Sequence, residues 1–199
     1  MTHSLHRRGV VDDLKKDYVV LAQLAMGINN NPKFRKKFLK IGEIFNDNDP
    51  KSIMNRLGWN ASSTITASYD QLSNVQRILS KLKDKDYGIS IVVSGLRSEI
   101  HNMLKEINLK PHTVHLFLGT FGKKDRLPKE EILEITTLCG HHCIAPRSVE
   151  NFINQLKGGK ISIEEAAQRI SKPCVCGIVN TTRVKDVLSR IIYEENKTK

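Results

Sequence analysis

The sequence predicts an α/β fold in which a mixed or parallel sheet carries packed helices, followed by an all-helical region that bears every cysteine. Strand-like and helix-like segments alternate through residues 1–122, whereas only helical patterns follow Gly122. A ferredoxin-like α+β plait is the smaller variant of the same pattern. We therefore expect an α/β domain at 1–122 and a helical metal-binding region at 123–199.

Four short apolar segments of the first part have strand character. Each contains β-branched or aromatic residues and is bounded by Gly, Pro, Asn or polar residues. They lie at 18–25, 64–69, 88–93 and 113–118. Helices long enough to cross between strands separate the first three, and this favours crossover connections and a largely parallel or mixed sheet.

Helical patterns fill the remaining length. Pro32 suits the first turn of a basic amphipathic helix, and Asp70 is placed to cap the helix that follows the second strand. A capping box at Ser162 and a cap at Asn180 or Thr181 predict the starts of the last two helices. The remaining predicted helices lie at 96–107, 128–138 and 146–157.

The composition is that of a globular protein, with 39% hydrophobic and 27% charged residues. The first residues lack the apolar run of a secretory signal, and no stretch is long and apolar enough to span a bilayer, so we expect a cytoplasmic protein without a membrane partner. The net charge of +11 would attract nucleic acid, an acidic protein or an anionic cofactor. With only 6% aromatic residues and no base-stacking signature, nucleic acid is not the favoured partner.

The cysteines are confined to two short segments near the C-terminus. Cys139-Gly-His-His-Cys143 ends a predicted helix, and Cys139 continues the apolar stripe of that helix, so its side chain points inward. In the second segment, Cys174 and Cys176 lie on the same side if the chain is extended. We expect the two segments to fold back and bring the four side chains to one point.

Four thiolates are a standard ligand set both for an iron–sulfur cluster and for structural zinc. The unequal spacing of the two cysteine pairs is unlike the paired turns of zinc ribbons, so a 4Fe-4S cluster is favoured and zinc is the alternative. His141 or His142 could replace a thiolate. Basic residues flank the cysteines and suit an anionic centre; these are Arg147, Lys172 and Arg183. Simple core packing and a dithiol–disulfide pair are the competing interpretations.

Two further groups are candidates for binding. Ser94-Gly95 ends a predicted strand and opens a helix, which is where α/β proteins often bind anions or cofactors, although a plain turn explains it equally. The N-terminal residues His3, His6, Arg7 and Arg8 could fold over an anionic site, with a solvated arm as the default. No catalytic arrangement is recognised, so whether the protein is an enzyme is left open.

Several motifs resemble an uncharacterised family of anaerobic bacteria and methanogenic archaea. They are Leu5-His-Arg-Arg-Gly9, Asp17-Tyr-Val-Val20, Gly88 to Gly95, Leu109 to Val114, Glu134 to His141 and Pro173-Cys-Val-Cys-Gly177. The resemblance covers most of the chain and implies an anaerobic, oxygen-sensitive setting, which favours iron–sulfur over zinc. It also implies that Cys143 is not always kept, in which case His141 or an N-terminal histidine completes the ligand set.

The sequence thus leads to one hypothesis and one rival. The first is an iron–sulfur protein that acts in electron transfer, redox sensing or metalloenzyme maturation, with an acidic redox protein or a metalloenzyme as partner. The rival is a basic regulatory or nucleic-acid-binding protein in which zinc fixes the C-terminal helices. A small-molecule enzyme that uses Ser94-Gly95 is a third possibility.

Overall fold

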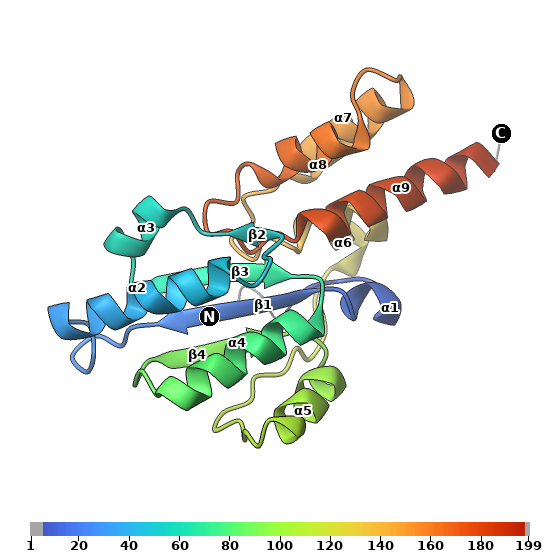
Figure 1. Cartoon of the computed structure of the whole chain (residues 1–199). Helices are drawn as coiled ribbons and strands as arrows, with labels where there is room; N and C mark the ends of the chain where they lie inside the picture. Colours follow the sequence, from blue (N-terminus) through green and yellow to red (C-terminus); the bar gives the residue numbers. More distant parts are fainter. Residues whose placement is uncertain (1–5, 198–199) are drawn as a thin grey trace.

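A computed structural model describes residues 6–197 of the chain (Figure 1), so His3 lies outside the described residues. Its sheet has four strands in the order β2-β3-β1-β4. The strands are β1 (Tyr18–Gln23), β2 (Ser52–Ile53), β3 (Thr64–Tyr69) and β4 (Ser90–Ser94). Three of the four predicted strands are therefore present with boundaries shifted by two residues or fewer.

Every neighbouring pair in the sheet is antiparallel, so the predicted parallel pairing is wrong. β3 and β4 both run opposite to β1, and β1 lies between them. The helix that links β3 to β4 is a crossover, as its length predicted, but the two strands it joins are not neighbours. The alternation of strands and helices along the sequence therefore predicted the crossover correctly. It could not reveal that β1 lies between the two strands that the crossover joins.

The same split arrangement occurs twice. β1 and β2 run in the same direction with β3 between them, and they are linked by the helix α2 (Pro32–Asn46). β3 and β4 are linked by α4 (Leu72–Lys85), with β1 between them. Two interleaved βαβ units of this kind make a β-α-β-β-α-β plait, here with the short helix α3 (Arg56–Ala61) inserted between β2 and β3.

The predicted caps mostly agree with the structure. Pro32 begins α2, and the side chain of Asn31 accepts a hydrogen bond from the amide of Phe34 at 3.3 Å. The Asp70 cap is wrong, because α4 begins at Leu72 after Gln71 and has no side-chain cap. Asp70 instead lies 3.6 Å from the ammonium group of Lys51.

The fourth predicted strand, 113–118, does not form. After α5 (Arg97–Glu106) the chain runs without strand pairing to a short 3-10 helix, η2 (Lys124–Arg126). Every residue from Pro111 to Gly119 is exposed. The alternating apolar pattern therefore has no strand neighbour within the described residues.

The C-terminal part is helical, as predicted. Its helices are α6 (Glu130–Thr136), α7 (Pro146–Lys157), α8 (Ile163–Ser171) and α9 (Thr181–Lys197), and a short helix α1 (Val11–Leu14) near the N-terminus was not predicted. Ser162 caps α8 by accepting from the amide of Glu165, and Asn180 caps α9 by accepting from the amide of Arg183. Among the helices described between residues 6 and 197, none combines the length and the apolar run that crossing a membrane requires.

The two faces of β1 contribute to two different cores. Tyr18, Val20 and Ala22 pack with the helices α2 and α4, whereas Val19 packs with the C-terminal helices. In Figure 1, α2 and α4 lie on one side of the sheet and α6 to α9 lie away from them. The C-terminal region is thus attached to the face of the sheet that α2 and α4 leave free.

Candidate metal centre

The two cysteine segments meet in turns at the ends of helices. Cys139 is buried and is the third residue after α6, and the loop after it turns at His142, which has a φ of 55°. Cys174 is buried after α8, Cys176 is half-buried, and Cys143 is exposed. All four thiols are free. Cys139 and Cys174 therefore face the core, and Cys143 faces solvent.

Contacts between the sulfur atoms form a continuous chain across both segments. The Sγ atoms of Cys174 and Cys176 lie 3.6 Å apart, and the Cys176 Sγ lies 3.5 Å from the Nδ1 of His141. The Cys139 thiol interacts with the thiols of Cys174 and Cys143. We call these five residues the cysteine cluster. The sequence predicted that these side chains converge, and the structure brings them together.

The cluster as it stands consists of hydrogen-bonded thiols rather than a finished coordination shell. Within residues 6–197, no three side chains of His, Cys, Asp or Glu are already arranged to hold a metal ion. Thiols must lose their protons and turn their lone pairs inward before they bind a metal. The relevant question is therefore whether the sulfur positions fit a metal after that change.

The separation of the Cys174 and Cys176 sulfur atoms matches that of two ligands on a single ion. With zinc–sulfur bonds of about 2.3 Å in a tetrahedron, two ligating sulfur atoms lie roughly 3.8 Å apart. The 3.6 Å between Cys174 and Cys176 is close to this value. A four-iron cluster is larger than one ion, so its thiolates must stand further apart than the sulfur atoms do here. The exposed Cys143 and half-buried Cys176 are the residues that would have to move outward.

The thiols differ in acidity because of how they contact one another. The hydrogen bond with Cys174 and burial hold the pKa of Cys139 above its ordinary value. The hydrogen bond with Cys174 lowers the pKa of Cys176, so Cys176 is the cluster's most readily formed thiolate. Desolvation and the neighbouring Cys139 raise the pKa of Cys143.

This difference predicts the pH dependence of alkylation in the metal-free protein. Because only thiolates react, the rate of Cys176 modification by iodoacetamide should reach half its maximum at a lower pH than that of Cys143. Normalising each profile to its own maximum removes the difference in exposure. Mass spectrometry of peptides across a pH series measures both sites, and denaturant should bring the two profiles together. Profiles in the reverse order in the folded protein would contradict the assignment.

The N-terminal arm braces the two cysteine segments, contrary to the expectation of a solvated arm. The Arg7 guanidinium donates to the carbonyl of Leu138 at 3.2 Å and to the carbonyl of Ile178. Leu138 directly precedes Cys139, and Ile178 directly follows Gly177. The ring of His6 stacks on that of His142 with a centroid distance of 5.6 Å. One arginine therefore ties together the two halves of the cysteine cluster.

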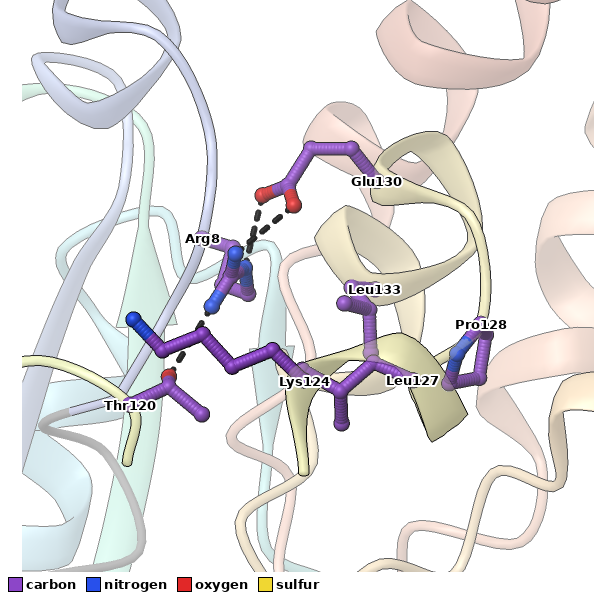
Figure 2. A pocket seen from close by; sticks show the side chains of 7 residues that line it. All are labelled: Arg8, Thr120, Lys124, Leu127, Pro128, Glu130 and Leu133. Atoms are coloured by element: carbon purple, nitrogen blue, oxygen red, sulfur yellow. Dashed lines mark hydrogen bonds and ion pairs between the residues drawn. The ribbon is translucent and has the colours of Figure 1, made fainter. Parts of the chain in front are cut away.

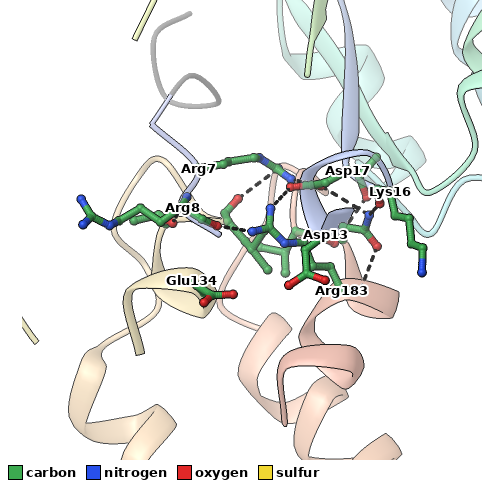
Figure 3. Close-up of polar contacts among 12 residues, drawn as sticks. Arg7, Arg8, Asp13, Lys16, Asp17, Glu134 and Arg183 are labelled. Carbon is green, nitrogen blue, oxygen red and sulfur yellow. Dashed lines mark hydrogen bonds and ion pairs between the residues drawn. The ribbon is translucent and has the colours of Figure 1, made fainter. Parts of the chain in front are cut away.

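A buried ion-pair network supports this brace (Figure 3). The Asp17 carboxylate is fully buried and accepts from Arg7 and, at 2.5 Å, from Arg183. Arg183 also donates to the carbonyl of Arg8. Arg183, which the sequence analysis grouped with the cations that flank the cysteines, therefore directs its charge at Asp17. The other two flanking cations, Arg147 and Lys172, are exposed.

The second cysteine segment is also fastened to the sheet. The Thr66 hydroxyl of β3 donates to the carbonyl of Cys176, and that of Ser68 lies 3.4 Å from the carbonyl of Val179. Gly177 lies against the backbone of Ile53 and Met54, where a side chain would overlap the chain, and its φ is +68°. Glycine at this position is therefore required by both space and conformation.

Sequence reasoning missed the role of Arg7, Asp17 and Thr66. Asp17 stands directly before an apolar strand, and this was the one available signal. A carboxylate at the start of a buried strand needs a charged or hydrogen-bonding partner. The partners lie more than 160 residues away for Arg183 and Asn180. No local pattern reveals contacts of that separation.

Ser94 and Gly95 join the end of β4 to the start of α5. Ser94 is buried at the end of β4, and α5 begins at Arg97. A side chain at Gly95 would come within 2.6 Å of the Tyr18 ring, so close packing alone accounts for the glycine. An anion-binding role for this pair remains a prediction.

A polar cavity of about 270 Å³ lies beside the N-terminal arm (Figure 2). Arg8 crosses it, bonding Thr120 at 3.0 Å and both carboxylate oxygens of Glu130 at 2.6 and 2.7 Å. These bonds hold the pKa of Glu130 below its ordinary value. Lys124 extends toward the same side chains. The residues that line the cavity thus hold Arg8 of the N-terminal segment against α6.

Comparison with known proteins gives no family for this chain. No family model matches it, and neither the curated proteins nor the solved structures contain a significant match. The functional argument therefore depends on the cysteine cluster and its surroundings.

Proposed function

We propose that this chain is a metal-binding protein whose centre is held by Cys139, Cys143, Cys174 and Cys176, with His141 able to replace one thiolate. The observation that supports this most strongly is the continuous chain of sulfur contacts between segments 30 residues apart. Core packing alone does not explain the set, because Cys143 is exposed and Cys176 is only half-buried. Apolar packing would bury all four.

The 3.6 Å between the sulfur atoms of Cys174 and Cys176 favours a single tetrahedral ion, such as zinc, as the occupant. Such an ion would join the end of α6 to the loop that lies on β2 and β3. Its binding free energy would then stabilise the attachment of the C-terminal helices to the sheet. In this form the protein is a basic regulatory or nucleic-acid-binding protein with a structural metal.

An iron–sulfur cluster is the second candidate, favoured by the unequal cysteine spacing. Its larger size would require outward movement of the solvent-facing Cys143. That solvent-facing side would allow electrons to reach the cluster from a partner. In this form the protein acts in electron transfer, redox sensing or metalloenzyme maturation. We also assign the sheet to the ferredoxin-like class on its strand order.

Metal analysis after anaerobic purification tests the proposal. We expect bound metal in the wild-type protein and its loss when Cys139, Cys174 or Cys176 is replaced by serine. Zinc without colour identifies the single ion, whereas iron, sulfide and a brown colour identify the cluster. A matched control is His115→Ala, which removes an exposed histidine outside the cluster.

Titration of the metal-free protein with Co²⁺ provides a second readout. Thiolate ligation produces intense near-ultraviolet charge-transfer bands that weaker oxygen ligation does not. A protein that is purified free of zinc and iron and gives no such bands with Co²⁺ would exclude the metal centre. Formation of a Cys174–Cys176 disulfide in that protein would then support a redox pair.

A further inference from the structure

The four cysteines of the cluster differ in how far their sulfur atoms are built into the protein. Cys139 and Cys174 are buried and Cys176 is half-buried, whereas Cys143 is exposed. The metal centre that we propose would therefore have three ligands on the protein side and one on the solvent side. The surroundings of the sulfur atoms show whether this difference extends beyond exposure.

Backbone contacts fix the sulfur atoms of the second cysteine segment. The amide of Ile178 donates hydrogen bonds to the sulfur atoms of Cys174 and Cys176. The Thr66 hydroxyl holds the carbonyl of Cys176, and Gly177 packs on the backbone of β2. Amide donors of this kind orient a metal-bound thiolate and share its negative charge. Both cysteines therefore have the surroundings of a permanent ligand.

The two cysteines of the first segment differ from one another in the same respect. The amides of His141 and Cys143 donate hydrogen bonds to the sulfur of Cys139. The thiol of Cys143 instead donates to the carbonyl of His141 at 3.9 Å. A carbonyl oxygen can only accept, so this contact is lost when the sulfur binds a metal as a thiolate. Cys143 is therefore the ligand that the protein supports least.

We propose that Cys143 is an exchangeable ligand, and that its position on the metal accepts a thiolate from outside the chain. This inference rests on the proposed metal centre in its single-ion form. Zinc sites with three permanent protein ligands keep the fourth position for an external ligand. A metal held by three soft thiolates selects a fourth soft ligand. The external ligand is therefore a thiol, either a free small molecule or the cysteine of a partner protein.

The exchange conserves atoms and charge. The sulfur of the incoming thiol forms a bond to the metal, and the bond between the metal and the Cys143 sulfur breaks. The proton of the incoming thiol moves to the departing Cys143 sulfur. The metal keeps its oxidation state, so the exchange needs neither an oxidant nor a reductant. The product is a centre with three ligands from this chain and one from the incoming thiol.

Chemical rescue of the Co²⁺-loaded protein tests the proposal. In Cys143→Ser we expect one Co²⁺ per chain and about three quarters of the wild-type thiolate charge-transfer intensity, because three of four Co–S bonds remain. Added 2-mercaptoethanol should restore the wild-type intensity. Cys143 is exposed, so the variant should fold, and unchanged thermal unfolding of the metal-free protein checks this.

The matched control is Cys174→Ser, which removes a buried ligand with an amide donor. It should lose Co²⁺, and 2-mercaptoethanol should not restore the bands. His141 lies 3.5 Å from the Cys176 sulfur and could fill the position that Cys143 leaves. Cys143→Ser/His141→Ala is therefore measured as well, and rescue is expected there even if the histidine blocks it in the single variant.

A folded protein with one exposed cysteine is the second probe. Rescue by both probes admits a partner's cysteine as the source of the ligand, whereas rescue by 2-mercaptoethanol alone restricts the source to free thiols. Equal loss of Co²⁺ from Cys143→Ser and Cys174→Ser overturns the inference and leaves the metal centre standing. The same holds if neither probe rescues the double variant. A wild-type protein without thiolate bands overturns both the inference and the proposed function.

Discussion

Replacing Asp17 with asparagine should destabilise the protein by about 3–5 kcal/mol, because it leaves two buried guanidinium groups without their anion. The Asp17 side chain is fully buried, and those of Arg7 and Arg183 are 6% and 1% exposed. The substitution preserves the shape of the side chain, so the loss reports charge rather than packing. Urea unfolding of the metal-free protein measures it.

Asp12→Asn is the matched control for this change. Asp12 lies in α1, is 91% exposed, and lies 3.5 Å from Lys15 across one helical turn. An exposed pair of this kind contributes about 0–1 kcal/mol. If Asp17→Asn and Asp12→Asn unfold at the same urea concentration, the buried network is not a stabilising element and our account of the brace is wrong.

Gly177→Ala should also have a large effect, roughly 3 kcal/mol or more of unfolding free energy. An alanine side chain would overlap the backbone of Ile53 and Met54, and the left-handed φ of +68° adds further strain. Because the overlap is with backbone atoms, no change of side-chain rotamer can relieve it. The cysteine segment should therefore detach from β2. Metal binding should weaken together with stability.

Trp59 offers a local readout of this detachment. It is the chain's single tryptophan, it is buried, and its indole donates to the carbonyl of Met54 at 2.7 Å. Its fluorescence should change in Gly177→Ala under native conditions. The control is Gly159→Ala, where φ is +63° but nothing lies within 4 Å, so the cost should be only about 1 kcal/mol. Equal losses in the two variants would show that the contact with β2 is unimportant.

Features that depend on neighbouring residues were predictable from the sequence. The Pro32 helix start, the Ser162 cap and the extent of α7 each follow from a few adjacent side chains. The strand directions were not predictable, because they depend on which strand is inserted between two others. Thr113–Leu118 shows the same limit, since its pattern is that of a strand and its pairing depends on what lies beside it.

The candidate site divides in the same way. Cys139 could be placed on the inner face of its helix from a spacing of three and four residues, and the turn glycines made convergence with Cys174 and Cys176 plausible. The supports of the site could not be placed, because Arg7 and Asp17 reach it from the other end of the chain. Sequence patterns indicated that the cysteines converge, and only the fold identified what supports them.

The brace has a consequence for how the protein forms during synthesis. The hydrogen bonds that Arg7, Arg8 and Asp17 make with Leu138, Ile178 and Arg183 span 131 to 175 residues. On the ribosome, Arg7, Arg8 and Asp17 must therefore wait for more than 130 further residues to be made before they find these partners. The plait can be assembled before that point, whereas the cysteine cluster can close only after the segments that carry Leu138, Ile178 and Arg183 have emerged.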